Sequence, residues 1–268
     1  MTILRQFVWG ILILVFAASL LAGLLAPAPY AKQFRDSPNA APSRRFPLGT
    51  DELGRDRLSR LLYGSRVSLL LAPAAALLST FIAALVGGLA GYLGGWRERL
   101  IVRSIDLFLS LPWLYLLLTV RALLPLNVSP VASVSITFTL LGLLGWAGPA
   151  RVVRAGVRSL TNSDFALQAR ACGCRKSRLL VMHLLPNLKP ILQAQFWISV
   201  PVFILAEANL GLLGLGVAEP LPSWGNLLRG LESYGAVHSH PWMLAPMLLL
   251  VIVMGSLQLV FPGQEYSS

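Results

Sequence analysis

The chain has 268 residues, of which 56% are hydrophobic and 12% are charged, and its mean hydropathy is +0.69. A soluble domain would carry about twice that share of charge, so an ordinary soluble fold is excluded. The net charge of +11 would suggest nucleic acid in a soluble protein. Here the cations lie mostly between apolar runs, which favours membrane lipid and a cytoplasmic partner, and no nucleic acid. Several runs reach the roughly 20 residues that a membrane helix needs, so we predict an all-α, polytopic membrane protein.

The first predicted element is an apolar helix over residues 7–26, preceded by Arg5. The Ala-Pro-Ala sequence at 26–28 faintly resembles a signal-peptide cleavage site, but the apolar run is long for a signal peptide. We therefore expect an uncleaved first span with the amino terminus in the cytoplasm. The polar, Pro-rich residues 28–66 then form an outer loop.

The end of this loop predicts a separate amphipathic interfacial helix between residues 47 and 69. Leucines and arginines recur there at helical spacing, and Thr50 or Asp51 is the candidate cap. The same stretch holds a series of short turn and charge patterns: Gly49-Thr50-Asp51, Gly54-Arg55-Asp56, Ser59-Arg60 and Tyr63-Gly64.

Small residues recur every four positions along the second span, residues 67–95. This stripe predicts a face against which another helix packs closely, although membrane helices are rich in glycine and alanine in general. The sequence does not name the partner helix. The stripe consists of Ala75, Ser79, Ala83, Gly87, Gly91 and Gly95.

Four more spans follow, at about residues 105–124, 131–150, 190–216 and 242–260. The first of these contains Pro112. It also carries Asp106 and Arg121 near its two ends, where we expect their side chains to reach the membrane interface. The sequence therefore predicts six transmembrane helices.

The longest polar interval of the second half, residues 164–187, predicts two short helices at the cytoplasmic surface, hinged near Gly173. We expect Pro186 to stop the second helix. Cys172 and Cys174 are interpreted as plain small residues, because a disulfide between them would be strained and a metal site needs more ligands. The cations of the interval are Arg170, Arg175, Lys176 and Arg178.

Glu207 is the one acid well inside an apolar run. A buried carboxylate faces protein or water, so it either belongs to a translocation path or gate, or pairs with a helix backbone or a cation on a companion subunit. Gly214 and Gly216 follow it, and we expect them to bend or break the helix or to admit a neighbour. Pro222, Ser223, Trp224 and Gly225 then form a turn that shapes the outer rim.

Three of these stretches resemble the second, or C-type, permease of bacterial ABC importers for dipeptides, oligopeptides and nickel. The turn and charge patterns at 49–64 are similar to the loop after the first span of that branch. Leu-Gly-Leu-Gly at 213–216 and Pro-Ser-Trp-Gly at 222–225 are similar to the end of its fifth span. The interval at 164–187 is similar to the coupling loop that docks on the ATPase, although Leu167 and Gln168 stand where the loop's Glu-Ala pair is expected. The residues that the resemblance assigns to coupling are Arg170, Ala171, Gly173, Arg175, Lys176, Arg178, His183, Leu185 and Pro186.

The resemblance implies a type I ABC importer permease fold. Residues 1–66 would form the first span, outer loop and interfacial helix. Residues 67–262 would form the permease domain with its coupling loop at 151–189, and residues 263–268 a short carboxyl-terminal tail. The protein would lie in the bacterial inner membrane with both termini in the cytoplasm.

The resemblance also implies partners: a companion permease, two cytoplasmic ATPase subunits and an extracytoplasmic substrate-binding protein. We expect no cofactor, metal or enzyme activity in this chain, since ATP and Mg would bind to the ATPase subunits and no Gly-Lys-Ser loop occurs. His238 and His240 leave an outer metal pair open, but loop histidines are common. The expected function is half of a translocation path for peptides or a small solute such as nickel. A stand-alone channel or an intramembrane enzyme is the alternative.

Overall fold

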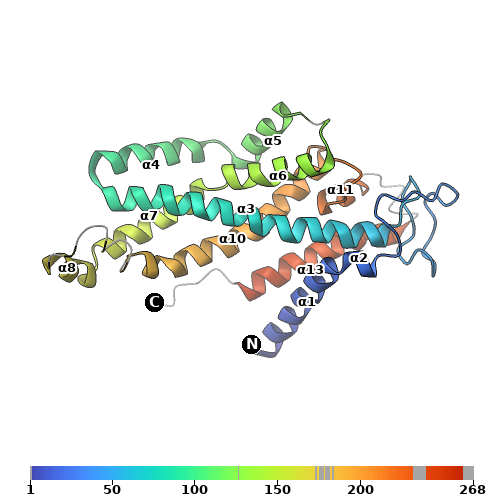
Figure 1. Ribbon diagram of the computed structural model, residues 1–268, viewed down its shortest axis with the longest axis horizontal. Helices are drawn as coiled ribbons and strands as arrows, with labels where there is room; N and C mark the ends of the chain where they lie inside the picture. Colours follow the sequence, from blue (N-terminus) through green and yellow to red (C-terminus); the bar gives the residue numbers. More distant parts are fainter. Residues whose placement is uncertain are drawn as a thin grey trace. The chain divides into compact units, whose positions relative to one another are not determined.

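The computed structural model describes residues 2–125, 127–172, 174, 178, 182, 184–231 and 240–261, with side chains from residue 4 (Figure 1). In these ranges the regular structure is helical, and extended backbone pairs only at the isolated bridges Gln33–Arg55 and Thr50–Asp56. The all-α prediction is confirmed. The chain divides into two compact units, one made of residues 1–72, 120–138 and 201–268, and the other of residues 73–119 and 139–200.

The first unit packs its terminal helices together. Helix α1 (Thr2–Leu20) is followed by the short α2 (Ala22–Leu25) and lies beside α13 (Ala245–Val260). The rings of Trp9 and Phe261 meet edge to face with their centroids 5.7 Å apart. Helix α11 (Trp224–Arg229) also contacts α13, which the 3₁₀ helix η2 (Pro241–Leu244) precedes. These contacts join the two ends of the described chain within one unit.

The interfacial helix expected at 47–69 does not form a separate element, because α3 begins at Arg57 and runs unbroken to Leu93. Its cap is Asp56, whose carboxylate accepts the Ser59 N–H at 2.7 Å, and neither Thr50 nor Asp51 takes that role. The backbone before it turns at Gly49 and Gly54, which have φ angles of +68° and +72°. Positive φ favours glycine and interrupts a helix, so the helical spacing of the leucines takes effect only after residue 56.

The second unit contains the stripe of small residues, and its packing face is confirmed as far as Gly91. Helix α7 (Ala147–Thr161) is the partner, because a Cβ atom added at Gly87 would collide with the Ala150 backbone. A Cβ atom at Gly91 would lie 2.7 Å from the Arg154 carbonyl oxygen. Gly95 is exposed and opens the next helix, so the stripe ends one step earlier than predicted.

The third predicted span is broken. Helix α4 (Gly95–Ser110) and helix α5 (Trp113–Leu123) meet at an 80° bend. Pro112 has no N–H to donate and disfavours helical geometry in the residue before it, and Leu111 is accordingly extended with ψ at 132°. The span predicted over 105–124 is therefore not one continuous helix.

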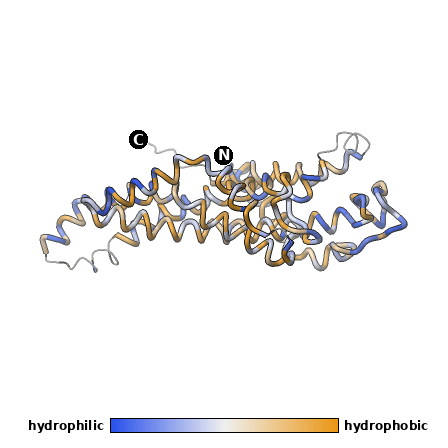
Figure 2. Tube along the Cα trace, turned by 90° about the horizontal axis from the view of Figure 1, so that it is seen from above, coloured by the Kyte–Doolittle hydropathy of each residue, from blue (hydrophilic) through white to orange (hydrophobic). Residues whose placement is uncertain are grey.

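Hydropathy supports four crossing helices, or five if the bent pair counts as one. The apolar part of α1, Leu4–Leu20, is shorter than the other candidates, so six crossings stays a prediction. Figure 2 shows hydrophobic residues along most of the helical path and hydrophilic residues in the irregular segment between α2 and α3. The long candidates are Arg57–Leu93, Pro130–Thr161, Leu185–Leu212 and Pro241–Val260, and they include α6 (Pro130–Leu144) and α10 (Leu185–Leu212).

Candidate functional site

Glu207 lies on α10 with no part of its surface exposed. One carboxylate oxygen, Oε2, accepts a hydrogen bond from the Ser68 hydroxyl at 3.2 Å and from the Gly225 N–H at 3.4 Å. The other oxygen has no hydrogen-bond partner in the described part of the chain. The carboxylate thus joins α3, α10 and the start of α11 through neutral donors. The sequence allowed it to pair with a helix backbone or with a cation, and the bond from the Gly225 N–H is of the backbone kind.

Glycines let the end of α10 approach α11. A Cβ atom added at Gly211 would collide with the backbone of Gly225, and one at Gly216 would lie 2.7 Å from the Cα of Gly211. Gly214 has φ +72°, and its N–H donates to the Gly211 carbonyl at 3.0 Å, as at a glycine-ended helix terminus. The expectation that Gly214 breaks the helix is confirmed, whereas a gating role for it, for Gly216 or for Glu207 stays a prediction.

The Pro-Ser-Trp-Gly turn is buried rather than displayed. The Trp224 side chain is 0% exposed and donates from its indole nitrogen to the Ser65 hydroxyl at 2.9 Å. Its backbone N–H donates to Ser68 at 3.2 Å, so that hydroxyl accepts from α11 while it donates to Glu207. Ser223 caps α11 by accepting the Asn226 N–H, and Pro222 is buried beside it. These four residues therefore support the turn from its buried side, and they do not form a surface that a partner protein could contact.

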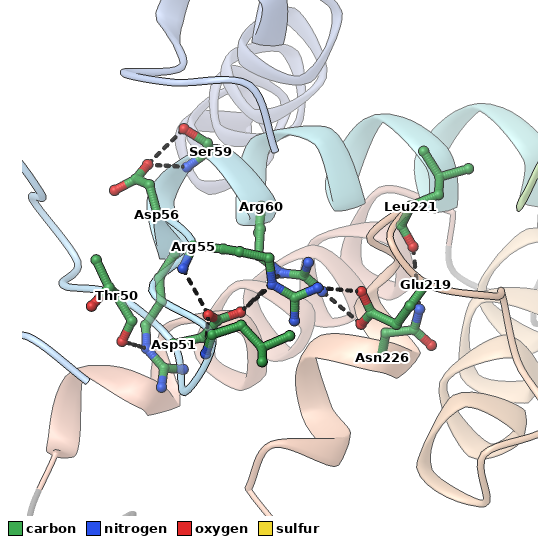
Figure 3. Close-up of polar contacts among 11 residues, drawn as sticks. Thr50, Asp51, Arg55, Asp56, Ser59, Arg60, Glu219, Leu221 and Asn226 are labelled. Atoms are coloured by element: carbon green, nitrogen blue, oxygen red, sulfur yellow. Dashed lines mark hydrogen bonds and ion pairs between the residues drawn. The ribbon is translucent and has the colours of Figure 1, made fainter. Parts of the chain in front are cut away.

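Two stretches that are far apart in the sequence meet in a network of charged side chains (Figure 3). The Glu219 carboxylate accepts from Arg55 at 2.7 Å and from Arg60 at 2.8 Å. Arg55 also donates to Asp51 at 2.6 Å. The side chains of Arg55 and Arg60 are 12% and 4% exposed, whereas that of Glu219 is 49% exposed, so two largely buried arginines meet one acid at the surface.

Arg121 occupies a different place from the one that the sequence suggested. It was expected to reach the membrane interface, but the residue is only 1% exposed. Its Nη2 atom donates to the Ser133 hydroxyl at 3.2 Å and to the Gly216 carbonyl at 3.4 Å. The guanidinium therefore points into the unit.

In the second unit the basic residues that open the predicted coupling loop are partly paired. Glu98 on α4 accepts from Arg154 at 2.9 Å and from Arg158 at 2.5 Å, and both arginines lie on α7. Arg151 pairs with Asp106 at a more exposed position. These contacts fix α7 against α4, so the helix that leads into the coupling loop is held by charge as well as by the glycine stripe.

The coupling residues that the structure describes lie at the surface. Helix α8 (Asp164–Ala171) buries only Ala166, which packs against Leu184, while Arg170 and Ala171 are exposed. Arg178, Leu185 and Pro186 are exposed as well. Gly173, Arg175, Lys176 and His183 lie outside the described residues, as do His238 and the tail at 263–268.

Pro186 is at the second position of α10, where its missing N–H is harmless. It starts that helix instead of stopping one, and the fifth span begins five residues before Pro190.

Sequence reasoning missed the burial of Arg121 and the pairing of Glu219 with two arginines. A signal was available for Arg121, since a cation inside an apolar run carries the same expectation of function as Glu207. For Glu219 there was no such signal, because its partners Arg55 and Arg60 are remote in the chain.

The helices and buried polar groups define a polytopic helical membrane protein with an exposed helix between two long spans, which is the class of a transport permease. The chain belongs to the family described as binding-protein-dependent transport system inner membrane component, whose model matches residues 83–263. It is thus a multi-pass inner-membrane protein of the ABC permease class.

The chain is similar to named permeases over most of its length. It is 34% identical to the dipeptide transport system permease protein DppC of Bacillus subtilis, over 87% of this chain and 71% of that one. It is 31% identical to the oligopeptide permease OppC of the same organism, over 87% and 74% of the two chains. It is 37% identical to the di/tripeptide permease DppC of Pseudomonas aeruginosa, over 83% and 73%.

Proposed function

We propose that this chain is one permease subunit of an ATP-driven importer and forms half of a translocation path for short peptides. The observation that carries the proposal is the family match over residues 83–263, supported by relatives named for dipeptides, oligopeptides and di/tripeptides. The peptide cargo comes from those names, and the chain does no chemistry of its own. ATP and Mg bind to partner ATPase subunits.

In this proposal the ATPase acts on the predicted coupling loop, residues 151–189. Its described surface combines the exposed cation Arg170 with apolar side chains that face outward, among them Leu167 at 50% and Leu185 at 53% exposure. Exposed apolar and basic side chains together suit a groove on a protein partner better than water. Because this surface lies between α7 and α10, a partner that moves it moves two long helices.

The mechanism is a rigid-body change in access. ATP closes the two ATPase subunits, the docked segment moves with one of them, and the attached spans rock between outward-open and inward-open states. A companion permease supplies the other half of the path, and an extracytoplasmic binding protein delivers the peptide. Both termini of this chain lie in the cytoplasm.

The test is purification of the tagged chain from native membranes in mild detergent, followed by mass spectrometry of the proteins that come with it. Two copies of an ATPase and a second, different permease are the expected companions. Proteoliposomes of this complex should then take up labelled dialanine only with ATP and the binding protein. A homo-oligomer without an ATPase would overturn the proposal and favour the channel or enzyme alternative.

A substitution separates coupling from assembly. Gly173→Pro should abolish ATP-driven uptake while membrane insertion stays intact, because proline cannot follow the backbone of the predicted hinge. Ser110→Ala, at an exposed position outside the coupling loop, is the control. Normal uptake by the Gly173→Pro protein would remove the coupling assignment.

A further inference from the structure

Arg121 is a buried cation without a counter-ion among the described residues. Its guanidinium has two neutral partners, Ser133 and the Gly216 carbonyl, and both bonds are long, at 3.2 and 3.4 Å. The Nε and Nη1 atoms have no hydrogen-bond partner in the described ranges. An uncompensated charge in an apolar helix is costly, so a positive group kept in this state calls for an anion.

A cavity lies beside this guanidinium. Its volume is about 150 Å³, and its walls include Arg121, Ser133, Ala218 and Arg229. A water molecule takes up about 30 Å³ in the liquid, so the cavity has room for a carboxylate and the atoms next to it. The space is therefore large enough for the missing anion and small enough to select its size.

The charges that line the cavity are unbalanced. Glu219 is the one acid in its wall, and that carboxylate is already bound by Arg55 and Arg60 from outside the cavity. Arg229 is exposed and makes no hydrogen bond or ion pair that the described residues show. Among the described residues the wall thus presents two cations, Arg121 and Arg229, and one acid, Glu219, which pairs with arginines outside the wall.

A second, wider cavity adjoins this one. It measures about 370 Å³ and shares Glu219, Asn226 and Arg229 with the first. Its walls also contain Asp51, Glu52, Arg55, Arg57 and Arg60, so with the shared Glu219 and Arg229 they hold four arginines and three acids. In each cavity the described arginines outnumber the acids by one, and a net positive lining favours an anionic group.

We propose that the cavity between Arg121 and Arg229 binds a carboxylate, and that this group is the terminal carboxylate of the transported peptide. Guanidinium groups suit the planar, two-oxygen geometry of a carboxylate, and the Ser133 hydroxyl is a further polar group in the wall. The identity of the carboxylate rests on the proposed function, whereas the anion site rests on the geometry of this unit.

A single thiol reports on the cavity. In the purified, complete transporter, Cys172→Ser and Cys174→Ser remove the native thiols, and Ala218→Cys places one at a half-buried position in the wall. Its alkylation by N-ethylmaleimide is followed by intact mass with dialanine or dialanine amide present. Dialanine should protect the thiol at a concentration about tenfold lower than its amide, because only dialanine offers a carboxylate.

Variants of the cation give the control. Arg121→Gln should remove the preference for dialanine over its amide. Arg121→Lys should keep part of it, because lysine keeps the positive charge but cannot donate two parallel hydrogen bonds to a carboxylate. Arg44→Gln, at an exposed arginine of the outer segment, should leave the preference unchanged. If Arg121→Gln fails to assemble, the comparison of acid and amide in the unsubstituted background decides alone.

The proposal would be overturned by equal protection by acid and amide, by no protection by either, or by a preference that survives Arg121→Gln. A thiol that reacts only after Arg121→Gln would mean that a carboxylate of the companion permease fills the cavity, which also overturns it. Uptake of dialanine without protection leaves the proposed function standing and removes the site. Protection of the thiol without ATP-driven uptake leaves the carboxylate site standing and removes the proposed transport function.

Discussion

Glu207 in the first unit and Glu98 in the second are both acids on membrane helices, but they have different kinds of partner. Glu207 is 0% exposed and is held by a hydroxyl and a backbone N–H. Glu98 is held by two guanidinium groups, on Arg154 and Arg158, whose side chains are 26% and 56% exposed. At Glu98 the cations of the ion pairs stay partly hydrated, whereas the fully buried carboxylate of Glu207 has neutral donors.

The difference has an energetic consequence. Removing a partner from a fully buried group leaves an unsatisfied donor that costs about 1–3 kcal/mol. Removing one member of a partly hydrated ion pair lets water replace it, and such pairs contribute only about 0.2–1 kcal/mol. Loss of the buried acceptor at Glu207 should therefore cost more than loss of the charge at Glu98, and substitutions at both positions test this order.

The largest effect is expected from Gly211→Ala. Its new methyl group would overlap the Gly225 backbone and push α11 away from α10, so the free energy of unfolding should fall by about 3 kcal/mol. Gly88→Ala is the matched control, since a Cβ atom there meets nothing within 4 Å. Thermal unfolding of the purified protein in one detergent measures both. Equal midpoints for the two variants would contradict the close contact.

Glu207→Ala should lower the free energy of unfolding by about 2 kcal/mol, because the Gly225 N–H loses its buried acceptor. Glu207→Gln keeps an acceptor oxygen of the same reach and should cost less than about 1 kcal/mol. The same thermal assay compares them. A larger loss for glutamine than for alanine would mean that the carboxylate itself, and not its role as acceptor, holds the contact.

Glu98→Gln should lower stability by about 1 kcal/mol at low salt, since two partly exposed arginines lose their counter-ion. The loss should shrink between about 0.01 M and about 1 M salt, because the Debye length falls from about 30 Å to about 3 Å. Glu207→Gln should show no such dependence on salt. Unfolding curves at the two salt concentrations measure both variants. A loss that depends on salt for Glu207→Gln but not for Glu98→Gln would contradict the prediction.

Asp106→Asn should have the smallest effect, less than about 0.5 kcal/mol. Its pair with Arg151 joins side chains that are 49% and 56% exposed, so water competes with the contact. A loss as large as that of Glu98→Gln would show that exposure does not set the strength of ion pairs in this unit.

Much of the fold could be predicted from the sequence because hydropathy and small-residue spacing act locally along a helix. The apolar runs predicted an all-α membrane protein, and the stripe that includes Gly87 and Gly91 predicted the face of α3 that packs against α7. The break at Pro112 was also local, but the prediction favoured apolar length over the missing N–H. The start of α3 at Arg57 was missed because positive φ at Gly54 is a property of the folded loop.

The polar groups were less predictable because their partners are distant in the chain. Glu207 stood out as a lone acid, yet nothing in its surroundings pointed to Ser68. Arg121 was placed at the interface because length alone allowed it, but its side chain is buried beside Ser133 and the Gly216 carbonyl. The contact of Arg55 and Arg60 with Glu219 exists only once the start of α3 and the segment between α10 and α11 have folded together.

The most direct test of the account is a cross-link from Cys172, a free and exposed cysteine at the end of α8. With Cys174→Ser in place, a benzophenone maleimide on Cys172 is photolysed in native membranes, and its adduct is identified by mass spectrometry. The account predicts a covalent adduct with a cytoplasmic ATPase, and none from a control thiol placed by Arg44→Cys in the outer segment. An ATPase adduct from the control, or none from Cys172, would contradict the assignment of this segment to coupling.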